Sequence, residues 1–108
     1  MHYYRLILET GDALDDEGTP VAWATCPDLP GAYEEASNAE MALEQLRALA
    51  RQIIAEHVVR EDPLDPAITV SATAPAHDDA TTLVVTVSDD DLTAAREAPM
   101  LVFEVPEP

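Results

Sequence analysis

Carboxylates are the side chains with the greatest capacity for chemistry in this sequence. Asp and Glu together account for 22 of the 108 residues. Cleavage of a phosphodiester by a two-metal mechanism requires several carboxylates that converge on ions about 4 Å apart. With so many acids, a few near strands are expected by chance, so the pattern alone predicts no metal site and no catalytic residue. The acids that lie within or at the ends of expected strands are Glu9, Glu34, Glu35 and Glu104.

The other residues that could support catalysis or ligand binding are isolated. His2, His57 and His77 are far apart and match no metal-ligand spacing. Cys26 has no basic neighbour in sequence that would stabilise a thiolate. We interpret His57 as a half-buried packing residue and the single tryptophan, Trp23, as part of the core. The sequence therefore predicts no enzyme and no bound cofactor or metal.

The net charge indicates which partners the chain can attract. It is −17, and all five basic residues are arginine. Such a field repels the phosphates of nucleic acids, whereas it attracts a basic protein and accelerates the encounter. The acidity is also typical of a solvated surface adapted to high salt or to solubility. The two interpretations are compatible, and both stay open.

The first third of the chain has the pattern of an antiparallel meander. Residues 3–9 are rich in strand-forming side chains, and residues 11–20 carry the turn residues and acids of an exposed hairpin loop. Residues 21–25 form the returning strand, and residues 32–36 form a third, short strand. Three sequential strands with short connections favour neighbouring antiparallel pairs.

The segment 37–60 is the clearest helix. Ser37 and Glu40 have the spacing of a capping box. Apolar residues recur at steps of three and four, which gives one continuous face that covers a sheet. The residues of this face are Leu43, Leu46, Ala50, Ile53 or Ile54, His57 and Val58.

The last part of the chain supplies further strands. Residues 67–73 and 82–88 alternate apolar and hydroxyl side chains, and we expect them to pair with each other as an extra hairpin. Residues 92–97 follow three acids and form a short helix. Residues 100–105 form a final strand. A chain of 108 residues accommodates one domain, so the predicted fold is a single α+β domain: an antiparallel β-meander covered on one face by one long helix, with additional C-terminal strands.

Between the second and third expected strands lies a turn rich in proline. In the run Cys26–Gly31, two prolines bracket an Asp-Leu pair and a glycine follows. Each proline fixes its own φ and favours extended geometry in the residue before it, and Gly31 can take a positive φ. The sequence predicts a rigid corner with Leu29 at its tip.

This corner, the linker after it and the helix start resemble the N-terminal domain of the HicB family of antitoxins. The family's PDLPG turn corresponds to Pro27–Gly31, its aromatic to Tyr33, its polar linker to residues 36–38 and its helix start to residues 39–43. The resemblance covers about residues 3 to 60. It implies a partial RNase H-like fold and an antitoxin function. Family members often add a DNA-binding segment, but residues 61–108 contain a single arginine, so direct DNA or RNA binding is not expected.

Three functions follow as hypotheses. The first is an antitoxin-like protein-binding module that neutralises a small, basic ribonuclease toxin of the HicA type. Leu29, exposed beside Tyr33, would supply its apolar anchor, and the alternative is that both side chains pack inward. The second is a stand-alone, self-associating regulatory or scaffold domain, expected to be a homodimer. The third is an RNase H-like metal-dependent nuclease, which the net charge opposes. The predicted partner-binding residues are Pro27, Asp28, Leu29, Pro30, Gly31, Tyr33, Glu34 and Glu35.

The sequence also indicates a location. No apolar run approaches the ~20 residues needed to cross a bilayer. The N-terminus lacks the basic and apolar regions of a signal peptide. One cysteine cannot form an internal disulfide. We therefore expect a cytoplasmic protein that does not bind membranes.

Overall fold

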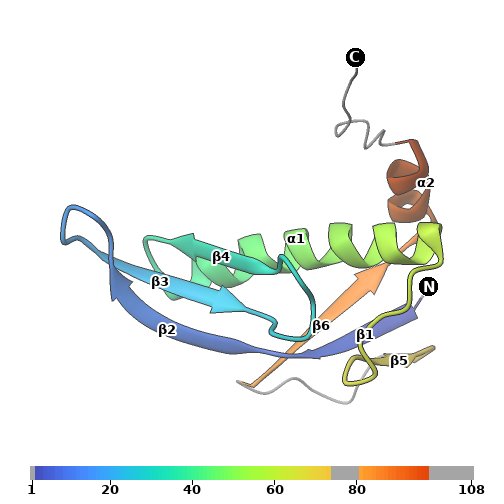
Figure 1. The fold of residues 1–108 in the computed structure, drawn as a ribbon, viewed down its shortest axis with the longest axis horizontal. Helices are drawn as coiled ribbons and strands as arrows, with labels where there is room; N and C mark the ends of the chain where they lie inside the picture. Colours follow the sequence, from blue (N-terminus) through green and yellow to red (C-terminus); the bar gives the residue numbers. More distant parts are fainter. Residues whose placement is uncertain (1, 74–80, 98–108) are drawn as a thin grey trace.

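The structure is a computed structural model that describes residues 2–73 and 81–97. Within these ranges the chain forms six strands and two helices, and the strands make two antiparallel three-stranded sheets (Figure 1). This arrangement confirms the α+β architecture. Neither helix in these ranges is long and apolar enough to cross a membrane. The strand expected over residues 100–105 lies outside the described residues.

Two strands at the N-terminus follow each other with one residue between them. β1 (His2–Ile7) and β2 (Glu9–Leu14) flank the buried Leu8, and Figure 1 shows them along one curved ribbon. β1 is the central strand of one sheet, and β2 is an edge strand of the other. The prediction of an exposed loop over residues 11–20 is wrong in its first half, because pairing with the next strand keeps residues 11–14 extended.

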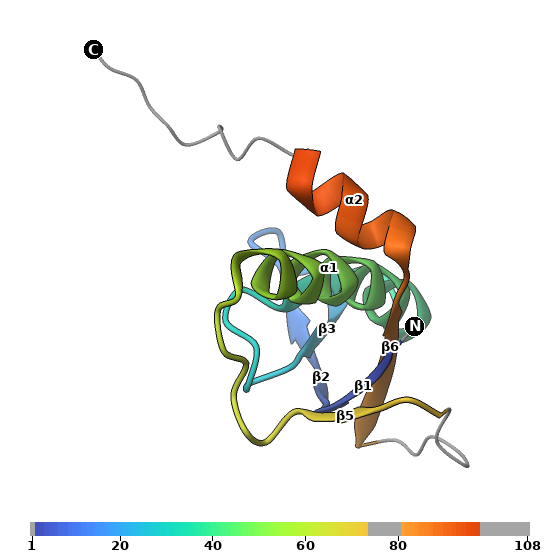
Figure 2. The ribbon, with the colours of Figure 1, turned by 90° about the vertical axis from the view of Figure 1, so that its right-hand side faces the viewer.

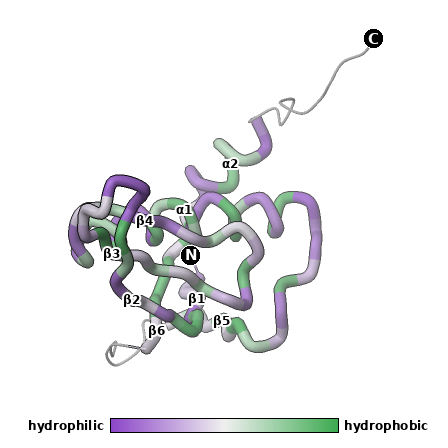
Figure 3. Tube along the Cα trace, turned by 60° about the vertical axis from the view of Figure 1, so that its left-hand side comes forward, coloured by the Kyte–Doolittle hydropathy of each residue, from purple (hydrophilic) through white to green (hydrophobic). Residues whose placement is uncertain are grey.

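The second sheet is a meander whose last two strands match the predicted runs 21–25 and 32–36. Its first strand is β2, not the predicted run 3–9, because most of that run forms β1 in the other sheet. β3 (Pro20–Thr25) pairs with β2 on one side and with β4 (Tyr33–Ala36) on the other. The β2–β3 turn is organised by Asp15, whose side-chain oxygen accepts hydrogen bonds from the backbone N–H groups of Glu17 and Thr19, both at 2.9 Å. The residues of this β2–β3 turn are hydrophilic (Figure 3). This part of the fold follows from local turn chemistry.

The first sheet differs from the prediction. The runs 67–73 and 82–88 contain β5 (Thr69–Ser71) and β6 (Thr82–Val87), but they do not pair with each other. Each pairs with β1, so that Tyr4 has a neighbour on both sides and the strand order is β5-β1-β6. The predicted extra hairpin is therefore wrong. The N-terminal strand inserts between the two runs because its alternating apolar residues bury one face of a shared sheet.

Helix α1 (Ala39–Arg60) begins two residues later than the predicted segment 37–60 and ends at the predicted residue. Asn38, in extended geometry, is the N-cap, and its side chain accepts a hydrogen bond of 2.9 Å from the backbone N–H of Met41. The capping box expected to begin at Ser37 is therefore wrong. The helix ends where Glu61 takes a φ of 60° in the left-handed region.

α1 packs against β3, β4 and β6 and so covers both sheets (Figures 1 and 2). Small residues are buried on both sides of the helix–sheet contact: Ala42 and Ala50 on the helix, and Ala22 and Ala24 on β3. With only a methyl group at these positions, the helix and strand backbones can approach closely. The larger buried side chains of the core are Tyr4, Leu6, Leu8, Leu29, Leu46, Ile54, Ile68, Leu83, Val85 and Val87.

The short helix predicted over 92–97 is present as α2 (Asp89–Glu97). Ser88 caps it: the backbone N–H of Ser88 donates to the Asp91 carboxylate at 2.8 Å, and the Asp91 N–H donates to the Ser88 hydroxyl at 3.2 Å. α2 packs on α1 (Figure 2). Three acids in its first turn suit the positive end of the helix dipole.

Two arginines of α1 cover the outer edge of β6. Arg47 donates to the carbonyl oxygen of Val84 at 2.7 Å, and Arg51 donates to that of Thr86 at 3.2 Å. The spacing of the two arginines along the helix matches that of the two carbonyl groups along the strand. Four residues of helix rise about 6 Å, and two residues of strand span about 6.7 Å. These bonds attach the helix to the first sheet and occupy carbonyl groups that another strand would otherwise pair with.

Replacing both edge arginines, Arg47→Met with Arg51→Met, should lower the free energy of unfolding by about 1–3 kcal/mol, because two strand carbonyl groups lose charged donors. Urea denaturation measures the change. The matched control is Arg5→Met with Arg96→Met, which removes the same charge from exposed sites. An equal loss in both double variants would show that the effect is one of net charge.

Candidate functional site

The Pro-rich corner is closed by backbone hydrogen bonds. The N–H of Leu29 donates to the carbonyl of Cys26 at 3.0 Å, and the N–H of Ala32 donates to that of Leu29 at 3.0 Å. The N–H of Cys26 donates to the carbonyl of Ala32 at 3.1 Å and so joins the two ends. Gly31 has a φ of 89°, as its place in the turn requires. The prediction of a tightly turned corner is confirmed.

Leu29 does not serve as an exposed anchor. Its side chain is 1% exposed and belongs to the core, so this part of the prediction is wrong. The corner turns its leucine inward because burial of that side chain holds the loop against the core. Tyr33 differs, with 51% of its surface exposed. Of the other predicted binding residues, Pro27, Pro30, Gly31 and Glu35 are exposed, and Asp28 and Glu34 are half-buried.

Trp23 lies on the outer face of the second sheet. Its strand neighbours Ala22 and Ala24 are buried, whereas Trp23 is half-buried. The expectation that Trp23 belongs to the core is therefore wrong. Side chains alternate along a strand, and the face toward α1 is occupied by the two alanines, so the indole must point away from the helix.

The indole covers a glycine on the neighbouring strand. Gly11 is directly opposite Trp23 in the β2–β3 register. A Cβ atom at position 11 would collide with the indole, most closely with its Cζ2 atom. A glycine in an edge strand leaves backbone uncovered, and an aromatic side chain from the next strand commonly covers it. Glycine is thus required here by the close approach of the ring.

Tyr33 extends the aromatic surface. Its ring centroid lies 6.4 Å from that of Trp23, with 18° between the ring planes, so the rings are nearly parallel and offset. The Tyr33 hydroxyl donates to Oε2 of Glu35 at 3.1 Å. Partial burial, together with this hydrogen bond and the negative charge of Glu35, raises the pKa of Tyr33 above its ordinary value. The hydroxyl is therefore a proton donor at neutral pH.

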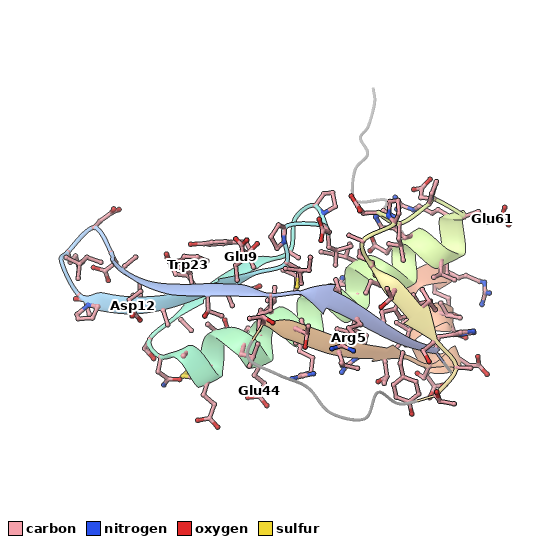
Figure 4. The ribbon with its side chains drawn as sticks, turned by 90° about the horizontal axis from the view of Figure 1, so that it is seen from below. Arg5, Glu9, Asp12, Trp23, Glu44 and Glu61 are labelled. Atoms are coloured by element: carbon pink, nitrogen blue, oxygen red, sulfur yellow. The ribbon has the colours of Figure 1, made fainter. Side chains whose placement is uncertain are left out.

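Two carboxylates bracket the rings. Glu9 lies across from Thr25, and Glu35 lies across from Trp23, on opposite sides of β3. Figure 4 shows Glu9 and Trp23 on one side of the strands, with Glu44 of α1 on the other. Glu9 and Glu35 are separated by two strand spacings across the sheet and two residues along it, roughly 12 Å in all. We call Trp23 and Tyr33, with Gly11 beneath and these two carboxylates beside them, the aromatic platform.

Of the carboxylates considered for metal binding, the three that the structure describes, Glu9, Glu34 and Glu35, do not form a cluster. Glu34 alternates to the face opposite Glu35 and pairs in register with Ala24. Glu104 and His77 lie outside the described residues. Within residues 2–73 and 81–97, no three His, Cys, Asp or Glu residues are placed to hold a metal ion.

A hollow of about 310 Å³ lies beneath the corner, lined by residues 27–30, His57 and residues 63–65. Two buried polar atoms of its lining residues, Oδ2 of Asp28 and Nδ1 of His57, have no hydrogen-bond partner. His57 is half-buried, as its interpretation as a packing residue requires. One carboxylate and one imidazole do not by themselves define a chemistry, and we assign none to this hollow.

Cys26 is held as a neutral thiol. Its side chain is 1% exposed. Burial, and secondly the negative charge of Asp28, raises the pKa of Cys26 to about 11. A thiolate is the nucleophilic form of cysteine, so this residue is unsuited to catalysis at neutral pH.

The aromatic platform is the feature that sequence reasoning missed. The sequence signal that could have revealed it is Gly11. A hairpin over residues 9–25 places this glycine directly opposite Trp23. Sequence reasoning placed the same glycine in a loop, which hid the pairing. Comparisons of the chain with protein families, curated proteins and solved structures found no match.

Gly11→Ala should destabilise the protein by about 1–3 kcal/mol, since the added methyl group displaces the indole. Thermal and urea denaturation measure the loss. In a Trp23→Ala background the same substitution should cost much less, because nothing then occupies the space above position 11. An equal cost in both backgrounds would contradict the contact.

The state of Cys26 predicts a pH dependence. Its pKa in the folded protein, about 11, is above its ordinary value of 9.0, so the unfolded chain loses the proton first. The thiol's contribution to stability is full below pH 9.0 and falls as the pH rises toward about 11. Urea denaturation of the protein and of a Cys26→Ala variant across this window isolates the effect. A constant difference between the two would contradict it, as would rapid alkylation of the folded protein at mildly alkaline pH.

Proposed function

We propose that this protein is an antitoxin-like binding module whose outer sheet face binds a small basic protein, a ribonuclease toxin of the HicA type. The observation that carries the proposal is the outer face of the β2-β3-β4 sheet. α1 packs on the opposite face, whereas Tyr33, Glu9 and Glu35 are exposed on this one. An open face with aromatic and acidic side chains is suited to a protein interface. The resemblance of residues 3 to 60 to HicB antitoxins supports the same function.

The net charge supplies the long-range part of recognition. A protein of −17 attracts a basic partner and accelerates its encounter. A ribonuclease must bind RNA phosphates with basic side chains. A carboxylate-rich surface competes for those side chains. The binding of this chain would thus inhibit the toxin by covering its RNA-binding surface.

The rigidity of the site supports tight binding. The corner before β4 is fixed by two prolines and by the hydrogen bonds that join Cys26 to Ala32. The buried Leu29 holds it to the core. Because this backbone is already ordered, less conformational entropy is lost when a partner binds.

Self-association is the second candidate. Val70, 51% exposed, lies on the edge strand β5, and such an edge can pair with a second copy. Against it, two copies of net charge −17 repel each other. Light scattering of the protein alone, over a range of salt concentrations, separates the candidates. A stable dimer, together with the absence of toxin binding, would favour self-association.

The direct test uses the purified chain and the purified product of a small basic gene adjacent to its own. A stoichiometric complex that blocks RNA cleavage is expected, with affinity that falls as salt is raised. The absence of a complex at low salt would overturn the proposal.

Charge removal locates the interface. The double variant Glu9→Gln with Glu35→Gln should bind the toxin roughly five- to tenfold more slowly, because two carboxylates at the interface are lost. Stopped-flow mixing at low salt measures the rate. The matched control, Glu40→Gln with Glu44→Gln, removes the same charge from α1. Equal slowing by both variants would mean that net charge alone steers binding and would contradict the assignment of this face.

A further inference from the structure

We infer that the aromatic platform is a recognition site for an arginine side chain, whose guanidinium stacks on Trp23 and Tyr33 and donates hydrogen bonds to Glu9 or Glu35. The inference rests on the proposed function, because the arginine is taken to belong to the basic protein partner. The inference goes beyond the proposed function because it names the chemical group of the partner that this face binds.

The rings offer a surface of suitable shape. Three ring atoms of Trp23 lie within 3 Å of the position that a Cβ atom would occupy at residue 11. The indole therefore packs directly on the β2 backbone. Trp23 is nonetheless only half-buried, so part of it faces solvent. The Tyr33 ring is inclined by only 18° to it. Two nearly parallel, partly exposed rings present the negative faces that attract cations.

The carboxylates add directional acceptors. The Tyr33 hydroxyl holds Oε2 of Glu35 at 3.1 Å, which fixes this carboxylate beside the rings. An ionised carboxylate can accept further hydrogen bonds. Glu9 lies on the other side of β3, roughly 12 Å from Glu35 by strand spacing and register. A planar group stacked on the rings can therefore donate N–H hydrogen bonds sideways, within its own plane, to the carboxylate of Glu9 or of Glu35.

This combination selects guanidinium over the other groups that stack on aromatics. Arginine is planar, weakly hydrated and has five donors, whereas the lysine ammonium is compact and strongly hydrated. A nucleobase also stacks, but it carries a phosphate that Glu9 and Glu35 repel. A purely apolar group would leave both carboxylates partly desolvated without a donor.

The single tryptophan makes the site observable, because all indole fluorescence comes from Trp23. The probes are three peptides of equal length, rich in arginine, in lysine or in neutral citrulline, titrated at constant ionic strength. The arginine peptide should change the emission at about fivefold lower concentration than the lysine peptide. The citrulline peptide, which stacks but is uncharged, should act only at much higher concentration.

Variants of Tyr33 assign the preference to the platform. Tyr33→Leu keeps apolar bulk but removes the ring, and it should abolish the difference between the arginine and lysine peptides. Tyr33→Phe keeps the ring and should retain most of the difference. Val70→Ala is the control, since Val70 is also 51% exposed but lies in the other sheet. Circular dichroism verifies that each variant is folded.

Equal responses to the arginine and lysine peptides would overturn the inference, as would a preference that survives Tyr33→Leu. A stronger response to single-stranded DNA than to the arginine peptide would also overturn it and would indicate base stacking. These outcomes are distinct from failure of the proposed function, in which no toxin complex forms although the peptides are still discriminated. If the toxin binds and the peptides are not discriminated, the proposed function stands and only the arginine site is lost.

Discussion

The close packing of α1 on β3 is the constraint on which the rest of the structure depends. The helix buries Ala42 and Ala50, and the strand buries Ala22 and Ala24. These alanines alternate with the larger Leu46 and Ile54 along the buried face of the helix, and their small size lets the two backbones approach closely. Strand alternation then requires Trp23 to point outward. The packing that makes the core compact therefore places a half-buried indole on the outer face of the sheet.

A second consequence concerns how the two sheets are joined. β1 and β2 form one nearly continuous strand that belongs to both sheets. α1 spans the junction and attaches itself to β6 through Arg47 and Arg51. Two of the five arginines are thus used for internal structure, in a chain that has only five basic residues. The outer surface is correspondingly acidic, which strengthens the attraction for a basic partner.

Side chains on the outer face of the β2-β3-β4 sheet both stabilise the fold and are available to bind a partner. The indole protects the backbone at Gly11, and Tyr33 positions the Glu35 carboxylate. A side chain that must be there for packing costs little additional entropy when it is also used for recognition. The rigid corner before β4 has the same character, since its buried Leu29 serves the core while its exposed residues remain available.

The sequence by itself determined the features that arise from neighbouring residues. Turn and strand propensities defined the corner and the two meander strands beside it, apolar periodicity defined the long helix, and composition defined the charge. They did not define the first strand of the meander, which the sequence predicted over residues 3–9 and the structure forms over residues 9–14. The tertiary structure decided which side of each element faces inward. Alternation shows that Trp23 and the alanines are on opposite faces, but only the position of α1 shows which face is buried. The inward turn of Leu29 and the insertion of β1 between β5 and β6 were likewise decided by contacts between residues distant in sequence, which local patterns do not encode.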